Sequence, residues 1–81
     1  MSQKIINSIT PIFREVFDAP SLIVTKELSA NDVENWDSLN HITLIVELEE
    51  LTELTFSTDE LVNLRDVGDF VELLASKGYH G

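Results

Sequence analysis

The sequence predicts an all-α fold, a small four-helix bundle with three main helices, one short helix and a long loop between the first two. Three segments carry apolar residues at steps of three and four, and no segment alternates with period two over enough residues to suggest a sheet. The chain has 81 residues, of which 43% are hydrophobic. This length and composition predict one globular domain over residues 1–81, with a core of modest size.

The first helix is expected over roughly residues 3–18, where Ile9 and Phe13 belong to an apolar series at helical spacing. Pro11 lies inside this segment and has no backbone N–H to donate. Two outcomes stay open at this point. Either the helix kinks at Pro11, or Thr10 caps a fresh start with Pro11 at its first position.

A long loop is expected over residues 19–37, because this segment has no sustained periodicity and contains Pro20 and several Ser, Thr and Asn residues. Leu22, Val24 and Leu28 are the side chains expected to attach it to the core. An ordered loop of this length in a compact domain usually has a function.

The second helix is expected from Ser38 to about Leu54, with the Asp37 carboxylate accepting backbone N–H groups of its first turn. The helical period places four residues on the predicted core face: Leu44, Ile45, Leu48 and Leu51. The opposite side carries an apolar stripe edged by carboxylates: Leu39, Ile42 and Val46, with Glu49, Glu50 and Glu53. Such a stripe suits a docking surface, although scattered surface apolar residues are also common.

The last two helices are indicated by their terminal residues. Ser57 and Glu60 have the spacing of a capping box and predict a short third helix. The fourth helix is expected to begin near Asp66 and to end at Lys77 and Gly78. Its predicted apolar face consists of Val67, Phe70, Val71 and Leu74.

The net charge of -10 is concentrated in the middle of the chain. Residues 27–64 include ten acidic residues and no Lys or Arg, whereas the rest of the chain has five of each sign. This distribution argues against nucleic acid or an anionic membrane as partner and favours basic proteins, the alternative being a solubilising face. The absence of cysteine excludes a disulfide scaffold and thiolate metal sites, and no metal site is expected.

No apolar run reaches the ~20 residues that span a bilayer. The segment MSQKIINSIT lacks a basic region followed by a long apolar one, so we expect no signal peptide and a cytoplasmic location.

Ser38 stands at the N-terminal end of the stripe on the second helix. A helix N-terminus presents free N–H groups and a partial positive charge, so a serine there can carry a phosphodiester. The alternative is a serine that only caps the helix.

The stretch WDSLNHITLIVELEE resembles the acyl carrier proteins, in a version typical of specialised stand-alone carriers with Trp36 before the Asp37-Ser38-Leu39 motif. The resemblance covers nearly the whole chain, including its length, acidity, helix order and long first loop. It implies that a phosphopantetheinyl transferase uses coenzyme A and Mg²⁺ to attach 4′-phosphopantetheine to Ser38. The thiol of that arm would hold acyl intermediates of fatty-acid, polyketide or specialised biosynthesis as thioesters. The protein would be a monomeric carrier rather than an enzyme.

The resemblance also assigns roles to individual residues. Asp37 and Leu39 match the recognition residues beside the attachment serine. The positions that match the docking face of the family are Ile42, Val46, Glu49 and Glu50. Glu53, at the end of the same face, is also expected to take part in docking. Thr43 stands where the family usually has a docking glutamate, and Thr52 where a core phenylalanine is common, so Leu51 or Phe56 would have to fill that gap.

Other functions can be compared on the same residues. A serine hydrolase built from Asp37, Ser38 and His41 would need separated segments around a pocket, so His41 is expected at the edge of the core face instead. A calcium-binding loop starting at Asp32 fails, because Asp37 and Thr43 stand where Gly and Glu are needed. An unmodified acidic adaptor and a peptidyl carrier remain as alternatives.

Two further expectations concern the interior. Trp36 either packs the end of the first loop against the bundle, or contacts the transferase or the arm. An apolar lining between the helices would permit an acyl chain to enter: Phe13, Phe17, Leu44, Leu48 and Phe70.

Overall fold

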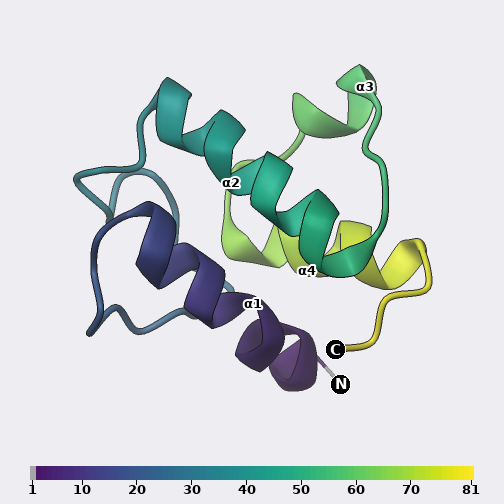
Figure 1. Cartoon of the computed structure of the whole chain (residues 1–81), viewed down its shortest axis with the longest axis horizontal. Helices are drawn as coiled ribbons and strands as arrows, with labels where there is room; N and C mark the ends of the chain where they lie inside the picture. The colour runs from purple at the N-terminus through teal and green to yellow at the C-terminus, as the bar shows by residue number, and fades with distance from the viewer. Residues whose placement is uncertain (1) are drawn as a thin grey trace.

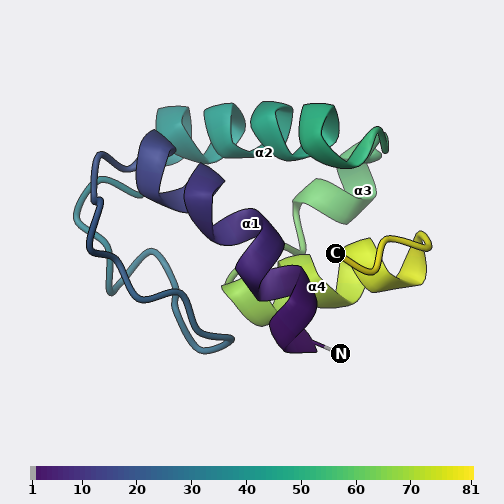
Figure 2. The same cartoon turned by 60° about the horizontal axis from the view of Figure 1, so that its bottom comes forward.

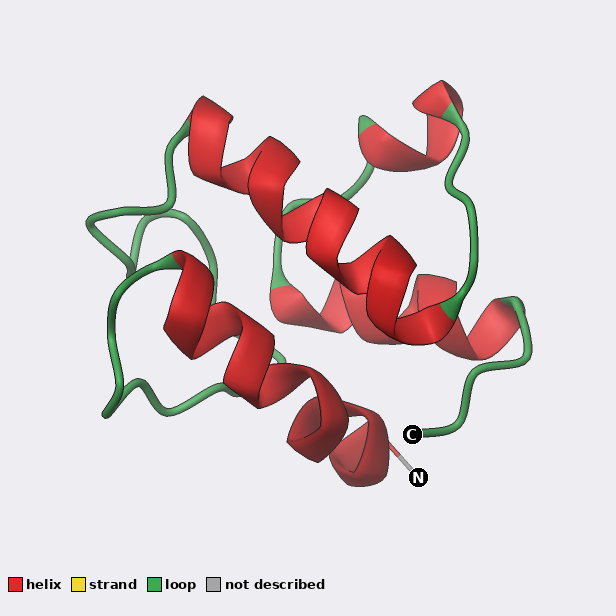
Figure 3. Cartoon of the chain, in the orientation of Figure 1, coloured by secondary structure: helices red, strands yellow, loops and turns green. Residues whose placement is uncertain are grey.

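The computed structural model describes residues 2–81, with side chains from Gln3 onwards, so Met1 of the expected domain range lies outside the described residues. Its helices are α1 (Ser2–Val16), α2 (Ser38–Thr52), α3 (Thr58–Leu61) and α4 (Val67–Ser76). The part of the chain that is described contains no strand, and the expected all-α, four-helix fold is confirmed (Figure 3). In Figure 2, α2 lies along one side of the bundle, with α1 and α4 beneath it and the long loop at one end.

Helix α1 runs through Pro11 as one helix, so the chain does not restart at that residue. The Thr10 hydroxyl donates to the carbonyl oxygen of Ile6 at 2.6 Å, which uses this side chain inside the helix rather than as a cap. The helix ends at Val16, two residues before the expected boundary, because Asp18 adopts a left-handed backbone with φ of 51°.

The core is formed where α1 packs against both α2 and α4 (Figure 1). Its largest fully buried side chains are Phe13, Phe17, Phe70, Ile9, Leu44, Leu48, Leu74 and Val67. The expected apolar face of α4 is therefore buried as predicted. Apolar burial of this kind is the main stabilising contribution in a domain of this size.

The long loop is attached to the bundle by side chains and by its backbone. Val24 is buried, and Leu22 and Leu28 pack against the core, as expected. The carbonyl oxygens of Leu28 and Lys26 accept hydrogen bonds from the backbone N–H groups of Val67 and Gly68, both at 2.9 Å. Next to them, residues 29 and 66 form an isolated antiparallel bridge. The loop is thus joined to the beginning of α4, far away in the sequence.

Helix α2 ends at Thr52, two residues earlier than expected, because Glu53 takes a left-handed conformation with φ of 58°. The placement of Leu51 in the core is wrong: its side chain is 44% exposed. The buried stripe is centred between Leu44 and Ile45, so the helical period brings Thr52, and not Leu51, to the core side of the last turn.

The gap at that end of the core is filled from outside the helix. Phe56, in the connection to α3, is buried and belongs to the core cluster. The capping box of Ser57 and Glu60 is present at the start of α3, and Asp66 caps α4 by accepting the backbone N–H of Asp69. Helix α4 ends at Ser76, and Lys77 at its C-cap forms an ion pair with Glu60 at 3.0 Å.

Candidate functional site

Ser38 is the first residue of α2, and its side chain is exposed. The preceding Asp37 has an extended backbone, and its Oδ1 accepts the backbone N–H of Asn40 at 2.8 Å, so the predicted N-cap is present. The Asn40 side chain in turn donates to the carbonyl oxygen of Asn35 at 2.8 Å. These contacts fix the direction from which the loop enters the helix, and thereby the place of the Ser38 hydroxyl.

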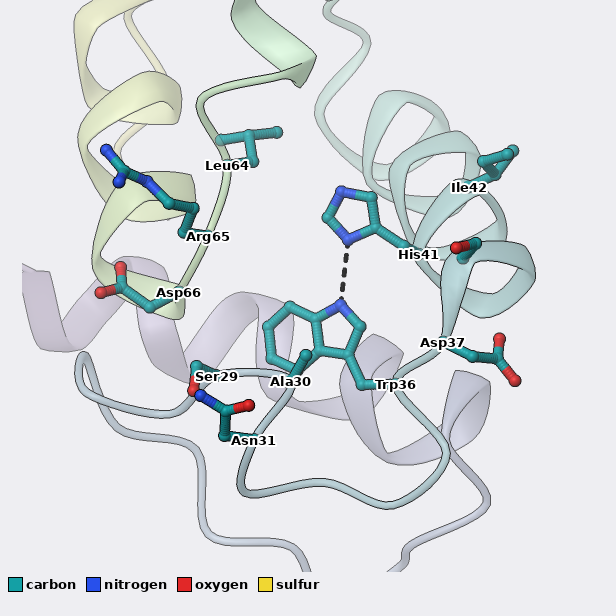
Figure 4. A pocket seen from close by; sticks show the side chains of 11 residues that line it. Ser29, Ala30, Asn31, Trp36, Asp37, His41, Ile42, Leu64, Arg65 and Asp66 are labelled. Carbon is teal, nitrogen blue, oxygen red and sulfur yellow. Dashed lines mark hydrogen bonds between the residues drawn. The ribbon is translucent and has the colours of Figure 1, made fainter.

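A surface groove of about 700 Å³ lies beside Ser38 (Figure 4). The long loop, the head of α2 and the connection between α3 and α4 each form part of it. Its lining consists of Ser29, Ala30, Asn31, Trp36, Asp37, Ser38, His41, Ile42, Leu64, Arg65 and Asp66. The groove is lined by both apolar and polar residues, which suits a flexible ligand that has both apolar and polar parts.

Sequence reasoning identified only part of this lining. Leu64 and Arg65 were not expected near Ser38, and neither were the loop residues Ser29 and Asn31. These segments meet because the loop pairs with residue 66 and because α3 returns the chain to the head of α2. No local pattern encodes either contact.

Trp36 is 6% exposed and forms the end of the loop where it meets the bundle. Its ring stacks on Phe17 with centroids 5.1 Å apart, and it meets Phe13 edge-on at 5.7 Å. Phe70 of α4 lies 6.3 Å away. The expected packing role is therefore confirmed, and the same side chain also lines the groove beside Ser38.

The indole Nε1–H of Trp36 donates to Nδ1 of His41 at 2.9 Å, and the two rings are nearly parallel (Figure 4). A nitrogen that accepts this bond carries no proton, so the proton of the neutral imidazole is on Nε2. Burial lowers the pKa of His41 below its ordinary value, because desolvation disfavours the charged imidazolium.

This geometry also argues against the hydrolase alternative. In a serine triad, the Nδ1–H of the histidine donates to a carboxylate, whereas Nδ1 of His41 accepts from Trp36. The carboxylate of Asp37 is used as a helix cap. Among the described residues, no group of three or more His, Asp or Glu side chains is placed to hold a metal ion.

The apolar stripe of α2 is exposed, at 73% for Leu39, 60% for Ile42 and 46% for Val46. Glu50 and Glu53 are exposed at its edge. Glu49 differs from them: it is half-buried, and its Oε2 accepts the backbone N–H of Phe56 at 2.9 Å. Thr43 is exposed, and its hydroxyl donates to the Leu39 carbonyl within the helix.

No protein-family model matches the chain. An acyl carrier protein of Acidothermus cellulolyticus is 32% identical to it over 74 residues, which are 91% of this chain and 88% of that protein. The chain belongs to the acyl carrier protein family. The resemblance seen in the sequence is thereby confirmed.

Solved structures agree with this membership of the acyl carrier proteins. The solution structure of the holo acyl carrier protein from Geobacter metallireducens has a TM-score of 0.83 to this carrier and 41% sequence identity, and the match covers 94% of each chain. A protein of Mycobacterium tuberculosis described as an acyl carrier protein has a TM-score of 0.79 at 24% identity, which supports the fold. That match covers 88% of this chain and 95% of the other. Among the described residues, no helix combines the length and the apolar character that crossing a membrane requires.

Proposed function

We propose that Ser38 carries 4′-phosphopantetheine and that the chain, as a single domain over residues 1–81, presents thioester-bound acyl groups to partner enzymes. The observation that carries this proposal is the exposed Ser38 hydroxyl at the capped start of α2, opening onto a groove of about 700 Å³ in a member of the acyl carrier family. The bound arm would supply a thiol on which acyl groups are held.

The surroundings of Ser38 fit such an arm. The first turn of a helix favours a negative group through its free N–H groups and the helix dipole, so a phosphodiester at Ser38 is tolerated well. Ser29 and Asn31 offer donors to amide and phosphate oxygens, and Ile42 and Leu64 offer apolar contacts. The arm has both kinds of group.

The attachment step is a substitution at phosphorus. With Mg²⁺ and a transferase, the Ser38 oxygen forms a bond to the β-phosphorus of coenzyme A, the bond to the bridging pyrophosphate oxygen breaks, and 3′,5′-adenosine diphosphate leaves. The proton of the hydroxyl passes to a base of the transferase. Asp37 and Leu39, on either side of Ser38, are the residues that we assign to recognition by this enzyme.

Partner enzymes would dock on the exposed stripe of α2. Ile42 and Val46 supply apolar area, and Glu50 and Glu53 supply negative charge at its edge. Residues 27–64 contain no Lys or Arg. The negative electrostatic field of this segment therefore attracts enzymes with basic faces and raises their association rate. Glu49 has one carboxylate oxygen engaged by Phe56, so we assign only its remaining oxygen to docking.

Intact mass spectrometry tests the attachment. The wild-type chain, Ser38→Ala and the control Ser21→Ala, an exposed loop serine, are each incubated with a broad-specificity transferase, coenzyme A and Mg²⁺. We expect one phosphopantetheine on the wild type and on Ser21→Ala, and none on Ser38→Ala. A gain of mass on Ser38→Ala, or no gain on the wild type with two unrelated transferases, would overturn the proposal in favour of an unmodified adaptor.

A further inference from the structure

The groove beside Ser38 has a closed floor. Trp36 and His41 both line it, and their rings lie nearly parallel with centroids 6.2 Å apart. The hydrogen bond from Nε1 of Trp36 to Nδ1 of His41 joins the loop to α2 across this floor. Figure 4 shows the imidazole projecting from α2 into the space that faces Leu64.

The space beneath this floor is already full. The Trp36 ring contacts Phe13, Phe17 and Phe70, whose side chains are 0%, 1% and 1% exposed. His41 also meets Phe70, with ring centroids 5.9 Å apart. None of these three phenylalanines lines the groove. Leu44 and Leu48 do not line it either, so the five residues that would have received an acyl chain between the helices all lie in the buried core cluster, to which Trp36 also belongs.

Trp36 lies between the groove and Phe13, Phe17 and Phe70, so an acyl chain that entered the core through this floor would have to displace it. That movement would break the Trp36–His41 hydrogen bond and remove an aromatic side chain, which buries ~150–250 Å², from its neighbours. The same movement would leave the indole N–H without its partner. The free energy gained by burying the acyl chain would be offset by this loss. A longer acyl chain should therefore protect its thioester from solvent little more than a short one.

We propose that Trp36 and His41 close the core to cargo, so that this carrier holds short acyl groups in the surface groove. Trp36 is the specificity-determining residue. His41 is a positioning residue that keeps the indole across the opening. The inference rests on the proposed attachment at Ser38 and adds to it the class of cargo.

The first experiment loads the wild-type chain with acetyl- or octanoyl-phosphopantetheine from the corresponding acyl-coenzyme A. Two properties are measured: the rate at which hydroxylamine cleaves each thioester, and the emission spectrum of Trp36, the one tryptophan of the chain. For the wild type we expect cleavage rates within about twofold of each other and unchanged emission, because neither chain enters the core. Octanoyl protection of about tenfold, or a shift of Trp36 emission with octanoyl alone, would overturn the inference.

Variants separate the two roles. Trp36→Leu should open the floor, so that the octanoyl thioester becomes the better protected of the two. His41→Ala should act in the same direction because it removes the acceptor for the indole, whereas His41→Asn keeps an acceptor near the position of Nδ1 and should restore equal rates. Equal rates in Trp36→Leu as well would contradict the assignment of Trp36. Circular dichroism establishes whether each variant is folded. Where a variant is not folded, the comparison of acetyl and octanoyl thioesters on the wild-type chain tests the proposal.

The outcome is distinguishable from failure of the proposed function. If no thioester can be loaded at Ser38, the attachment itself is wrong. If loading succeeds and the octanoyl thioester is protected in the wild type, only the proposal that Trp36 and His41 close the core is wrong.

Discussion

The Glu49 carboxylate accepts a hydrogen bond from the backbone N–H of Phe56, at 2.9 Å. Phe56 is buried, and its N–H would otherwise lack a described partner where the chain leaves α2. Glu49 therefore fastens the connection before α3 to the last turn of α2. This residue is part of the proposed docking face and part of the fold at the same time, so its substitution has two effects that must be separated.

Glu49→Ala should lower the free energy of unfolding by about 1–3 kcal/mol, because the N–H of Phe56 loses a charged acceptor in a half-buried place. For a domain of this size, each kcal/mol corresponds to a fall in Tm of about 4–8 °C. Glu50→Ala, at an exposed neighbour, should change stability by no more than about 0.5 kcal/mol. Urea unfolding measures both. Equal effects of the two substitutions would contradict a structural role for Glu49.

Asp37→Ala should cost about 1 kcal/mol, since α2 loses the side chain that accepts the Asn40 N–H. Asp37→Asn keeps an acceptor and should leave the unfolding midpoint nearly unchanged. The second variant therefore isolates the charge of Asp37 for transferase assays. The prediction fails if Asn destabilises the fold as much as Ala does.

Stability should fall as the pH is lowered past the ordinary pKa of histidine. Burial lowers the pKa of His41 in the folded state, so the unfolded chain, with its pKa near 6.5, binds a proton first. The contribution of His41 is fully present above that pH and is lost as the pH falls through the lower, folded pKa. Asp37, Arg65 and Asp66 line the same groove and contribute to the local field.

Urea unfolding at a series of pH values from about 7.5 to about 5.5 measures this loss of stability, and Trp36 emission is recorded on the folded protein at each pH. Protonation of Nδ1 would break the bond from the indole, so emission should change over the same range. His41→Asn should remove both effects. A wild-type profile identical to that of His41→Asn would show that another group titrates.

Glu53→Gly should stabilise the protein by about 0.5–1 kcal/mol, because Glu53 ends α2 with a positive φ that a residue with a Cβ adopts at a cost. Glu50→Gly places the same residue type inside α2 and should cost about 1 kcal/mol instead. Thermal unfolding of the pair decides the sign. A loss of stability in both variants would mean that the left-handed position carries no strain.

Added salt should raise the Tm, because the ten carboxylates of residues 27–64 repel one another without a cation among them. The ion pair of Lys77 and Glu60 is also screened, but a single pair with both side chains partly in solvent contributes little. A melt that stays flat from low to moderate salt would contradict this.

The parts of the fold that local chemistry determines were predictable from the sequence. Asp37 at the head of α2 and the Ser57–Glu60 box at α3 follow from capping rules, and the buried face of α4 follows from its period. Leu51 was misplaced because a helical period gives relative directions, whereas the neighbours that cover a helix decide where its buried stripe is centred. Both helices end earlier than expected because Asp18 and Glu53 are left-handed, and neither residue type signals a helix stop as strongly as glycine does.

The candidate site divides in the same way. Ser38 and its flanking residues could be read from the sequence, because motif and helix start coincide there. The opposite wall of the groove could not, since Leu64 and Arg65 arrive through tertiary contacts. The bond between Trp36 and His41 joins residues five apart, but their ring orientations depend on Phe17 and Phe70 beneath them.

The backbone hydrogen bonds between the long loop and α4 provide a way to measure how often the loop separates from α4. The N–H groups of Val67 and Gly68 are held by Leu28 and Lys26, on the side of the groove opposite α2. A Cβ at residue 68 would lie 3.3 Å from the Lys26 oxygen, so the two segments of chain approach closely there. Any excursion that separates the loop from α4 must free these two amide protons to exchange with solvent. Where they exchange faster than the amides of the core, their rates therefore give the population in which the loop has separated from α4, and loading of the carrier would be read as a change in those two rates.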